Sequence, residues 1–474
     1  MIPFSDIQNI FFLGVGGIGM SALARYFHHF GYPVAGYDRT PSPLTRELEN
    51  EGILVTYEDD PAVFSTEFAF FNAKHTLVVR TPAVPEDSAI YTYLREQRFD
   101  IRKRAEVLGM VTERRRALCV AGTHGKTTTS TMLAHLLYQS EIGTNAFLGG
   151  ISMNYGTNIL LQKDSNYVVV EADEYDRSFH HLTPYMSVVT AVDPDHLDIY
   201  GTPEAYREAF EHYTSLIKSA LVMKHGIDLQ PRLKKGVKLF TYAVLEKADK
   251  SDKSLPNFYA DNIRIRKGQI YFDFNINIPT AVTTIADLKL GVPVWVNIEN
   301  SVAALAVAWL NGVTDEELRH GLASFRGVQR RFNIHVNTPR VAYIDDYAHH
   351  PEEIATAIDS IRKLFPERKL IGVFQPHLYT RTRDFAEDFT RVLDTLDECI
   401  LLPIYPAREE PIPGVTSEML GGQVVEKKDL IAELKQRIAA SDRSVVILTV
   451  GAGDIDRLVP EITKELNRKE IENR

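Results

Sequence analysis

The stretch CVAGTHGKTTTSTMLAHLL, residues 119–137, contains the residue types that bind nucleotide phosphates. An apolar, strand-like run enters a glycine-containing loop, and a helix-like run follows. In a P-loop, backbone N–H groups surround the phosphates, a lysine reaches the β- and γ-phosphates, and a hydroxyl holds Mg²⁺. The loop is shorter than the usual P-loop, but its place between a strand and a helix predicts ATP binding. The predicted ATP-binding residues are Gly122, Thr123, His124, Gly125, Lys126, Thr127 and Thr128, and either Thr127 or Thr128 is the expected Mg²⁺ ligand.

Acidic segments follow two further strand-like runs. NYVVVEADEYD, residues 166–176, places Glu171 at the end of a buried run, and VVTAVDPDHLD, residues 188–198, places His196 among aspartates. Carboxylates suit Mg²⁺, and a phosphoryl reaction needs the charge of the metal. Histidine is an unusual Mg²⁺ ligand, so for His196 the chemistry leaves zinc binding and a hydrogen-bonding role equally open.

A second glycine loop lies near the start of the chain, in FFLGVGGIGMSALA, residues 11–24. Its GxGxxG spacing and a later aspartate predict a pyrophosphate at a helix N-terminus, from a dinucleotide or from a nucleotide sugar. A hydride-transfer enzyme needs one such site and no ATP loop. Two phosphate loops therefore indicate ATP-driven chemistry on a nucleotide-activated molecule. The predicted residues of this loop are Gly14, Gly16, Gly17, Gly19 and Asp38.

The elements that must position these residues alternate along the chain. Short apolar β-rich runs such as TLVVRT, YVVVEAD and SVVILTVGAGD are separated by helical patterns, which is typical of buried parallel strands. Ligands bind beyond the carboxyl ends of such strands. We expect three α/β domains: a Rossmann-like domain at 1–114, a central P-loop ATPase-type domain at 115–326, and a Rossmann-like C-terminal domain at 327–474.

Composition narrows the class of protein. The 474 residues carry a net charge of −10, which argues against general nucleic-acid or membrane binding. No apolar run reaches the length of a membrane span, and the first residues do not resemble a signal peptide. Cys119 and Cys399 lie in apolar runs and are interpreted as buried thiols in a reducing compartment. We therefore expect a cytoplasmic protein.

The motifs together resemble the Mur ligase family. AGTHGKTTT, EADEYDRSF, DPDHLDIYG, NIENSVAALAVA, RRFNIH, DDYAHHPEEI, FQPHLYTRTRDF and YPAREEPIPGVTS occur in the family's order over nearly the whole chain. The greatest similarity is to the alanine-adding branch. The resemblance implies that ATP phosphorylates the lactyl carboxylate of UDP-N-acetylmuramate, and that the amino group of L-alanine attacks the acyl phosphate. A branch that adds a tripeptide to the same acceptor is the alternative.

The resemblance also implies roles for single residues. Lys126 binds the β/γ-phosphates, Thr127 or Thr128 and Glu171 serve one Mg²⁺, and His196 serves a second Mg²⁺. The glycines from Gly14 to Gly19 hold the UDP pyrophosphate. Asn297 and Asn300 match the adenine-side motif. Arg330 or Arg331, together with Asp346, matches residues around ATP. His349 and Arg381 match positions near the amino acid and the reacting phosphate.

Some matches have structural alternatives, and three positions depart from the family pattern. Asn297 and Asn300 could simply start a helix, and His349 could cap the helix near Pro351. Val296 and Leu378 replace residues that contact adenine and supply a cation in many relatives. Phe210 stands near the place where other Mur ligases carry a carbamylated lysine, so that modification is not expected.

Overall fold

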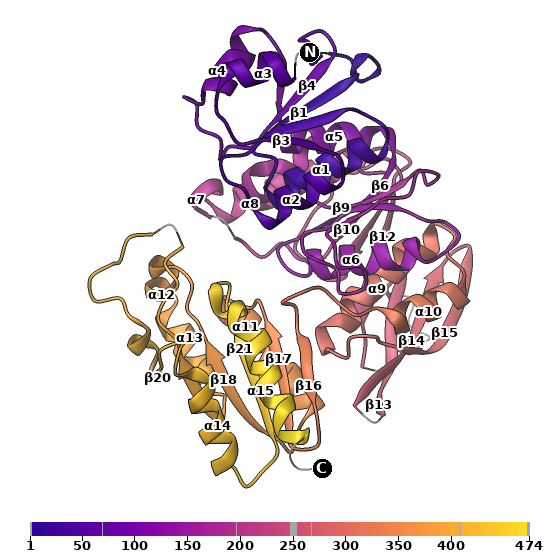
Figure 1. Ribbon diagram of the computed structural model, residues 1–474. Coiled ribbons are helices and arrows are strands. Elements are labelled where there is room, and N and C mark those ends of the chain that lie inside the picture. The colour runs from indigo at the N-terminus through magenta and orange to yellow at the C-terminus, as the bar shows by residue number, and fades with distance from the viewer. Residues whose placement is uncertain are drawn as a thin grey trace. The chain divides into compact units, whose positions relative to one another are not determined.

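The computed structural model (Figure 1) describes residues 2–68, 70–195, 197–246, 254–266, 268–407 and 409–471. The chain divides into two compact units. The first comprises residues 1–263, 272–288 and 299–325, and the second comprises residues 264–271, 289–298 and 326–474. Three sheets carry the candidate site residues.

The first sheet has five parallel strands in the order β3-β2-β1-β4-β5. The central strand β1 (Asn9–Leu13) is buried along its whole length, as its apolar sequence predicts. The first glycine loop connects β1 to α1 (Ile18–His29). The other elements are β2 (Val34–Tyr37), β3 (Leu54–Thr56), β4 (Thr76–Arg80), β5 (Asp100–Lys103), α2 (Pro43–Asn50), α3 (Pro61–Glu67), α4 (Ala89–Glu96) and α5 (Arg104–Arg114).

The second sheet has ten strands in the order β15-β14-β13-β12-β11-β10-β6-β9-β7-β8. The strand before the P-loop, β6 (Arg116–Ala121), lies between β9 (Tyr167–Glu171) and β10 (Met186–Val189), and both pair with it in parallel. The carboxyl ends of these three strands therefore meet at one edge, where the P-loop and both acidic segments begin. The remaining strands are β7 (Asn145–Phe147), β8 (Ile159–Leu160), β11 (Ala220–Lys224), β12 (Lys238–Val244), β13 (Phe258–Arg266), β14 (Gln269–Ile278) and β15 (Ala281–Lys289). The helices along this part of the chain are α6 (Lys126–Tyr138), α7 (Leu197–Tyr200), α8 (Pro203–Thr214), α9 (Trp295–Leu310) and α10 (Asp315–Ser324).

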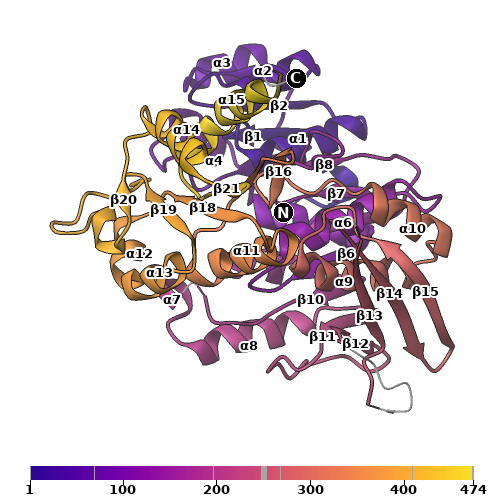
Figure 2. The same ribbon diagram turned by 90° about the horizontal axis from the view of Figure 1, so that it is seen from below.

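The third sheet has the order β16-β17-β21-β18-β19-β20, in which only the β16–β17 pair is antiparallel. In Figure 2, α14 and α15 lie on one side of this sheet, and α11 and α13 lie on the other. Its strands are β16 (Asn333–Asn337), β17 (Val341–Asp346), β18 (Lys369–Phe374), β19 (Glu398–Leu401), β20 (Gln423–Val424) and β21 (Val445–Val450). Its helices are α11 (Pro351–Leu364), α12 (Tyr379–Asp384), α13 (Ala386–Leu393), α14 (Leu430–Ala440) and α15 (Val459–Ile471).

The predicted α/β fold class is confirmed, and the structure has three sheets with mostly parallel strands. The quoted β-rich runs form β4, β9 and β21. Cys119 is buried as predicted, but Cys399, near the start of β19 and next to the short edge strand β20, is only half-buried. The polar sequence EKADKSDKS, residues 246–254, predicts an exposed loop and lies largely outside the described residues. None of the helices described is both long and apolar enough to cross a membrane. The domain boundaries at 114/115 and 326/327 stay predictions.

Candidate active site

The P-loop follows β6 in a conformation that requires glycine at two positions. Gly122 has φ +134° and Gly125 has φ +78°, in the region that side chains rarely adopt. A Cβ atom on Gly122 would lie 2.1 Å from Oγ1 of Thr190, and one on Gly125 would lie 2.7 Å from Oδ1 of Asn300. The glycines let the loop pass close to these side chains while α6 begins at Lys126.

Lys126 is held by the loop and by a buried carboxylate. Its Nζ donates to the carbonyl of Gly122 and to Oε1 of Glu174, both at 2.7 Å. Burial raises the pKa of Glu174 to about 7, although the charge of Lys126 opposes this shift. Oε2 of Glu174 is buried without a hydrogen-bond partner in the described part of the chain. The ammonium and the carboxylate thus form an ion pair where the family motif expects phosphate.

The Thr127 hydroxyl lies beside the end of β9. Its Oγ1 donates to Oε1 of Glu171 at 3.1 Å, and no such contact to Glu171 is found for Thr128 in the regions described. A hydroxyl and a carboxylate are hard oxygen donors, the type that Mg²⁺ binds together with substrate phosphates and water. These two residues fit a Mg²⁺ site that substrate oxygens complete. Among the described residues, no group of three His, Cys, Asp or Glu side chains could hold a metal alone.

The predicted second metal ligand, His196, lies outside the described residues. Asp193, two residues before the DHLD segment, is exposed, and its backbone carbonyl accepts a 2.7 Å hydrogen bond from the hydroxyl of Thr123. The second acidic segment therefore begins beside the P-loop, as the strand order requires.

The asparagines of α9 contact backbone and loop residues. Asn300 is buried, and its Oδ1 accepts a 3.2 Å hydrogen bond from Thr129 in the first turn of α6. Asn297 is also buried, and its amide donates to the carbonyl of Val292 at 3.4 Å. Asn300 thus supports the P-loop helix, and the expected adenine contacts of both residues stay predictions.

The N-terminal glycine loop is packed against neighbouring strands. The N–H of Gly16 donates to Oδ2 of Asp38 at 2.7 Å, so this aspartate holds the loop backbone. A Cβ atom on Gly14 would lie 2.4 Å from Thr81, and one on Gly19 would lie 2.9 Å from Nη1 of Arg104. Arg104 is a cation beside the loop that sequence reasoning missed. The only signal for it in the sequence is its place in the basic run at 102–116.

In the C-terminal sheet, Asp346 ends β17 and fixes two turns. Its carboxylate accepts from the N–H of Phe332 at 2.8 Å and from the N–H of Ala348 at 2.7 Å. Burial raises the pKa of Asp346 to about 6, against the attraction of Arg331. The two N–H groups belong to the neighbours of Arg331 and His349, so Asp346 positions the backbone that carries both.

Arg330 connects the same turn to the loop after β21. Its Nη2 donates to the carbonyl of Gly451 at 2.5 Å, and its Nη1 lies 3.5 Å from Oδ2 of Asp456. Arg330 has φ +60°, a left-handed conformation that an arginine adopts only when its surroundings impose it. The GAGD sequence, residues 451–454, is as typical of a turn as of a ligand loop, and its backbone carbonyls accept from this guanidinium.

A second group of side chains follows β18. The rings of His349 and His377 are 6.2 Å apart, and His377 stacks on Tyr405 at 5.8 Å. Burial lowers the pKa of His377 to about 4, and the neighbouring Arg381 adds to this shift. Burial also lowers the pKa of His349 despite the carboxylate of Glu353. His377 was missed as a site residue, although its position after the apolar run LIGVF marks it.

His349 and Arg381, predicted as neighbours of the reacting groups, thus lie in one charged cluster at the carboxyl edge of the third sheet. Nη1 of Arg381 is buried without a hydrogen-bond partner in the described regions. The capping alternative applies to His349 and His350, and the N-cap of α11 is His350; the backbone N–H groups of the two histidines donate to Oε2 of Glu353 at 3.0 Å and 3.4 Å.

Family models match the three sheets in turn. The model described as "Mur ligase family, catalytic domain" matches residues 9–116, "Mur ligase middle domain" matches 120–308, and "Mur ligase, glutamate ligase domain" matches 330–453. The chain belongs to the Mur ligase family. A curated relative from Parabacteroides distasonis is named UDP-N-acetylmuramate–L-alanine ligase. It is 55% identical over 477 residues, and the match covers 99% of this chain and 99% of the relative.

Solved structures of Mur ligases share the fold. The UDP-N-acetylmuramate–alanine ligase of Thermotoga maritima has a TM-score of 0.73 and 26% identity, with 98% of this chain and 100% of that chain covered. A murein peptide ligase from Psychrobacter arcticus has a TM-score of 0.61 and 21% identity, with 96% and 99% covered. This second Mur ligase likeness concerns the fold alone.

Proposed function

We propose that this Mur ligase joins L-alanine to the lactyl carboxylate of UDP-N-acetylmuramate, with ATP converted to ADP and phosphate. The observation that carries the proposal is the full-length relative at 55% identity that bears this ligase name. The murein peptide ligase, which represents the alternative of tripeptide addition, matches at only 21% identity. A dehydrogenase, the competing hypothesis, would need only one dinucleotide site and would not need the P-loop with Lys126.

The two glycine loops would bind the two nucleotides. The loop from Gly14 to Gly19 offers backbone N–H groups at the start of α1 to the UDP pyrophosphate. The P-loop would bind ATP. The Lys126 ammonium would then leave its ion pair with Glu174 and contact the β- and γ-phosphates. Arg104, beside Gly19, adds a positive charge to the UDP end of the site.

Thr127 and Glu171 would hold a Mg²⁺ ion, because their oxygens already lie 3.1 Å apart at the P-loop. Bound Mg²⁺ neutralises negative charge that develops on the phosphates during transfer. A second Mg²⁺ at His196 remains part of the proposal. The phosphoryl step then depends mainly on positioning and on charge neutralisation, and the P-loop supplies Lys126 for both.

The C-terminal residues would orient the acceptor and the reacting phosphate. Asp346 holds the backbone beside Arg331 and beside His349, so one carboxylate fixes the two turns that carry a guanidinium and a neutral imidazole. The low pKa of His349 leaves its ring uncharged at neutral pH, able to accept a hydrogen bond from an amine. We assign Arg381 to the transferred phosphate, and Asn297 and Asn300 to the adenine side.

We also propose that the chain has three domains, at 1–114, 115–326 and 327–474. The first carries the N-terminal glycine loop, the second carries the P-loop, and the third carries the residues near the acceptor. ATP and UDP-linked sugars are metabolites of the cytoplasm, so we place the reaction there.

The test is ADP release with UDP-N-acetylmuramate and a panel of amine acceptors, with products identified by mass spectrometry. L-alanine should be used fastest. Glycine and L-serine should be ligated more slowly than L-alanine, by a factor on the order of 10 to 200. They differ from L-alanine by one methyl or one hydroxyl group, and a binding pocket cannot discriminate strongly on so small a difference. The tripeptide L-Ala-γ-D-Glu-meso-diaminopimelate should be inert. If it is ligated faster than L-alanine, the chain is the recycling ligase.

A further inference from the structure

A groove with basic walls lies along the outer edge of the N-terminal sheet. β5 is the last strand in the sheet order and pairs with β4. The cavity beside it has a volume of about 600 Å³, which is within the range of small-ligand sites. None of the glycines from Gly14 to Gly19 lines it. The charged side chains that line it are Arg80, Arg95, Arg98, Arg102, Lys103, Asp100 and Glu106.

Two of the five cations are already neutralised. Arg80 pairs with Glu86, outside the groove, at 2.7 Å, and Arg102 pairs with Asp100 at 2.7 Å. The remaining carboxylate, Glu106, accepts from the backbone N–H of Lys103.

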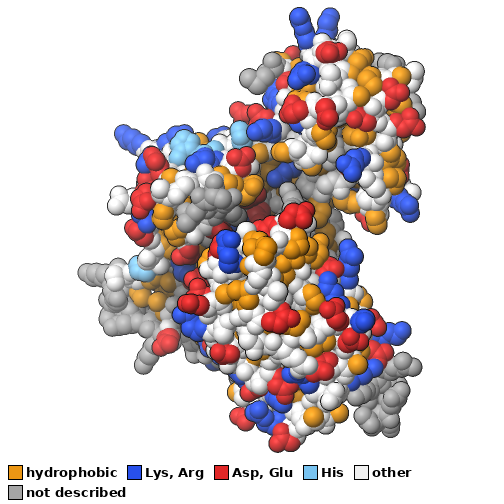
Figure 3. Space-filling view, turned by 90° about the vertical axis from the view of Figure 1, so that its left-hand side faces the viewer, with side chains coloured by type: hydrophobic (Ala, Val, Ile, Leu, Met, Phe, Trp, Pro, Cys, Tyr) orange, Lys and Arg blue, Asp and Glu red, His pale blue; other side chains and the backbone are white. Residues whose placement is uncertain are grey.

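This pairing leaves Arg95, Arg98 and Lys103 in excess. Over the described ranges, no carboxylate oxygen lies within 4.0 Å of their charged nitrogens. The excess stands out on a chain with a net charge of −10, and the face drawn in Figure 3 shows acidic and basic side chains interspersed. Three unpaired cations around one cavity raise the local concentration of anions.

The backbone of Arg98 is a second, independent observation. α4 ends in a turn where the N–H of Phe99 bonds to the carbonyl of Leu94 at 3.0 Å, and Arg98 takes the left-handed position with φ +61°. Glycine is the usual residue at this position, because a side chain there is strained. The turn thus holds an arginine where glycine is usual, and it places the Arg98 side chain in the wall of the groove.

An aromatic ring completes the wall. The guanidinium of Arg80 lies 4.0 Å from the centroid of the Tyr91 ring, and that of Arg95 lies 5.8 Å from the same ring. Tyr91 lines the groove and limits the rotation of both arginines. Of the three excess cations, Arg95 is thus the one that rests on this ring, and all three are exposed to solvent and open to a ligand.

An added peptide strand is a poor occupant for this edge. The N–H of Ile2 donates to Asp100 at 2.6 Å, and its carbonyl accepts from Arg102 at 2.9 Å. Residue 2 therefore lies across the start of β5, where a new strand would have to pair. A compact anion needs no backbone pairing and can be bound by the side chains of the cations that line the groove.

We propose that this groove binds a small metabolite bearing a di- or triphosphate, at a site separate from both glycine loops. Arg95 and Arg98 give forked contacts to the phosphate oxygens, and Lys103 supplies a point charge. Its lining residues belong to neither nucleotide loop, although Lys103 directly precedes Arg104, the neighbour of Gly19.

The test uses Tyr91→Trp as a local fluorescence reporter in the full chain at 0.15 M salt, titrated with inorganic pyrophosphate and, separately, with ADP. The fluorescence change, corrected for the response of the native chain, should saturate with pyrophosphate. Arg98→Gly in the reporter background should weaken pyrophosphate binding by roughly tenfold, because it removes one charge-assisted contact. The same substitution should raise the Tm, because it relieves the left-handed strain.

Lys126→Ala in the reporter background is the matched control, and it should leave the pyrophosphate affinity of the groove unchanged. Tighter binding of ADP than of pyrophosphate would identify a nucleotide as the ligand, and equal binding would identify the phosphates alone. Either result supports the site. A reporter that does not saturate, an Arg98→Gly affinity equal to that of the parent, or loss of the signal in Lys126→Ala would overturn it.

Discussion

The ammonium of Lys126 lies 2.7 Å from a carboxylate oxygen of Glu174, whose side chain is 2% exposed. This ion pair occupies the P-loop, where a lysine is expected to meet phosphate. A phosphate that reaches Lys126 must compete with a carboxylate of the same sign of charge. Glu174 therefore stabilises the nucleotide-free loop at some cost to nucleotide affinity.

Glu174→Gln should change how stability depends on pH. Burial raises the pKa of Glu174 to about 7 from 4.5, so the folded chain binds a proton that the unfolded chain releases across this interval. The resulting stabilisation is fully present below about pH 4.5 and is lost as pH rises through about 7. The free energy of unfolding of the native chain should therefore decrease between pH 5 and pH 8. In Glu174→Gln this decrease should be smaller by about 1–3 kcal/mol.

Urea titrations of both proteins at the two pH values measure this difference. Other titrating groups, such as His135 with its pKa lowered to about 4, contribute equally to both proteins and cancel. Identical pH dependence in the two proteins would show that Glu174 does not titrate in this interval.

Lys126→Ala should abolish ADP formation in a folded protein. The lost ammonium is the charge that the P-loop directs to the β- and γ-phosphates, and loss of one such contact lowers kcat by about 10²–10³ or more. Calorimetry should find the affinity for UDP-N-acetylmuramate unchanged, since the N-terminal glycine loop is untouched. Near-normal turnover would refute the ATP assignment.

Sequence pattern predicted the strands and the P-loop because both are local. The apolar runs before Gly122 and Glu171 specify parallel strands whose ends meet. The partner of Lys126 was not predictable, because EADEYD offers several equivalent acids. The choice depends on the turn after β9, where Asp176 and Arg177 have φ near +50°.

Contacts between distant elements explain the other omissions. Arg104 reaches Gly19 from a helix 85 positions later in the chain, and nothing in its neighbourhood distinguishes it from other basic residues. Asp38 resembles a ribose ligand by spacing, yet a tertiary hydrogen bond to Gly16 occupies one of its oxygens. Only the packing of β1 against β2 reveals that role.

Gly149→Ala should weaken the response to Mg²⁺. A Cβ atom at this position would lie 2.1 Å from Oε2 of Glu171, so the carboxylate must move relative to Thr127. We expect a higher Mg²⁺ concentration for half-maximal ADP release and a smaller change in the affinity for UDP-N-acetylmuramate. Glu171→Gln should show the same Mg²⁺ defect, because it removes the charge instead of moving it. An unchanged Mg²⁺ titration in Gly149→Ala would argue against Glu171 as a ligand.

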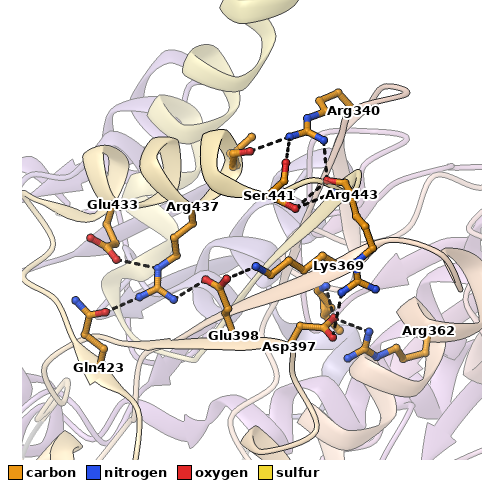
Figure 4. Close-up of polar contacts among 12 residues, drawn as sticks. Arg340, Arg362, Lys369, Asp397, Glu398, Gln423, Glu433, Arg437, Ser441 and Arg443 are labelled. Atoms are coloured by element: carbon orange, nitrogen blue, oxygen red, sulfur yellow. Dashed lines mark hydrogen bonds and ion pairs between the residues drawn. The ribbon is translucent and has the colours of Figure 1, made fainter.

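A network of charged side chains lies at the opposite edge of the C-terminal sheet, where its parallel strands begin (Figure 4). Arg437 on α14 contacts Glu398 at 2.8 Å, Glu433 at 2.8 Å and Gln423 at 2.5 Å. Glu398 also pairs with Lys369, and both cations hold the pKa of Glu398 below its usual value. The candidate site residues follow the other ends of these strands, so the network joins α14 to the sheet without touching the site.

Arg437→Ala should therefore lower stability and leave catalysis unchanged. The Arg437 side chain is 15% exposed and bridges two carboxylates, so its loss should cost about 1–2 kcal/mol in the free energy of unfolding. Arg391→Ala is the matched control, because Arg391 is 73% exposed and pairs only locally with Asp388 on α13. Its effect should stay within about 0.5 kcal/mol. Chemical denaturation and the ADP-release assay measure both quantities. A loss of kcat in Arg437→Ala at temperatures where the chain is folded would show that the network reaches the site through the strands.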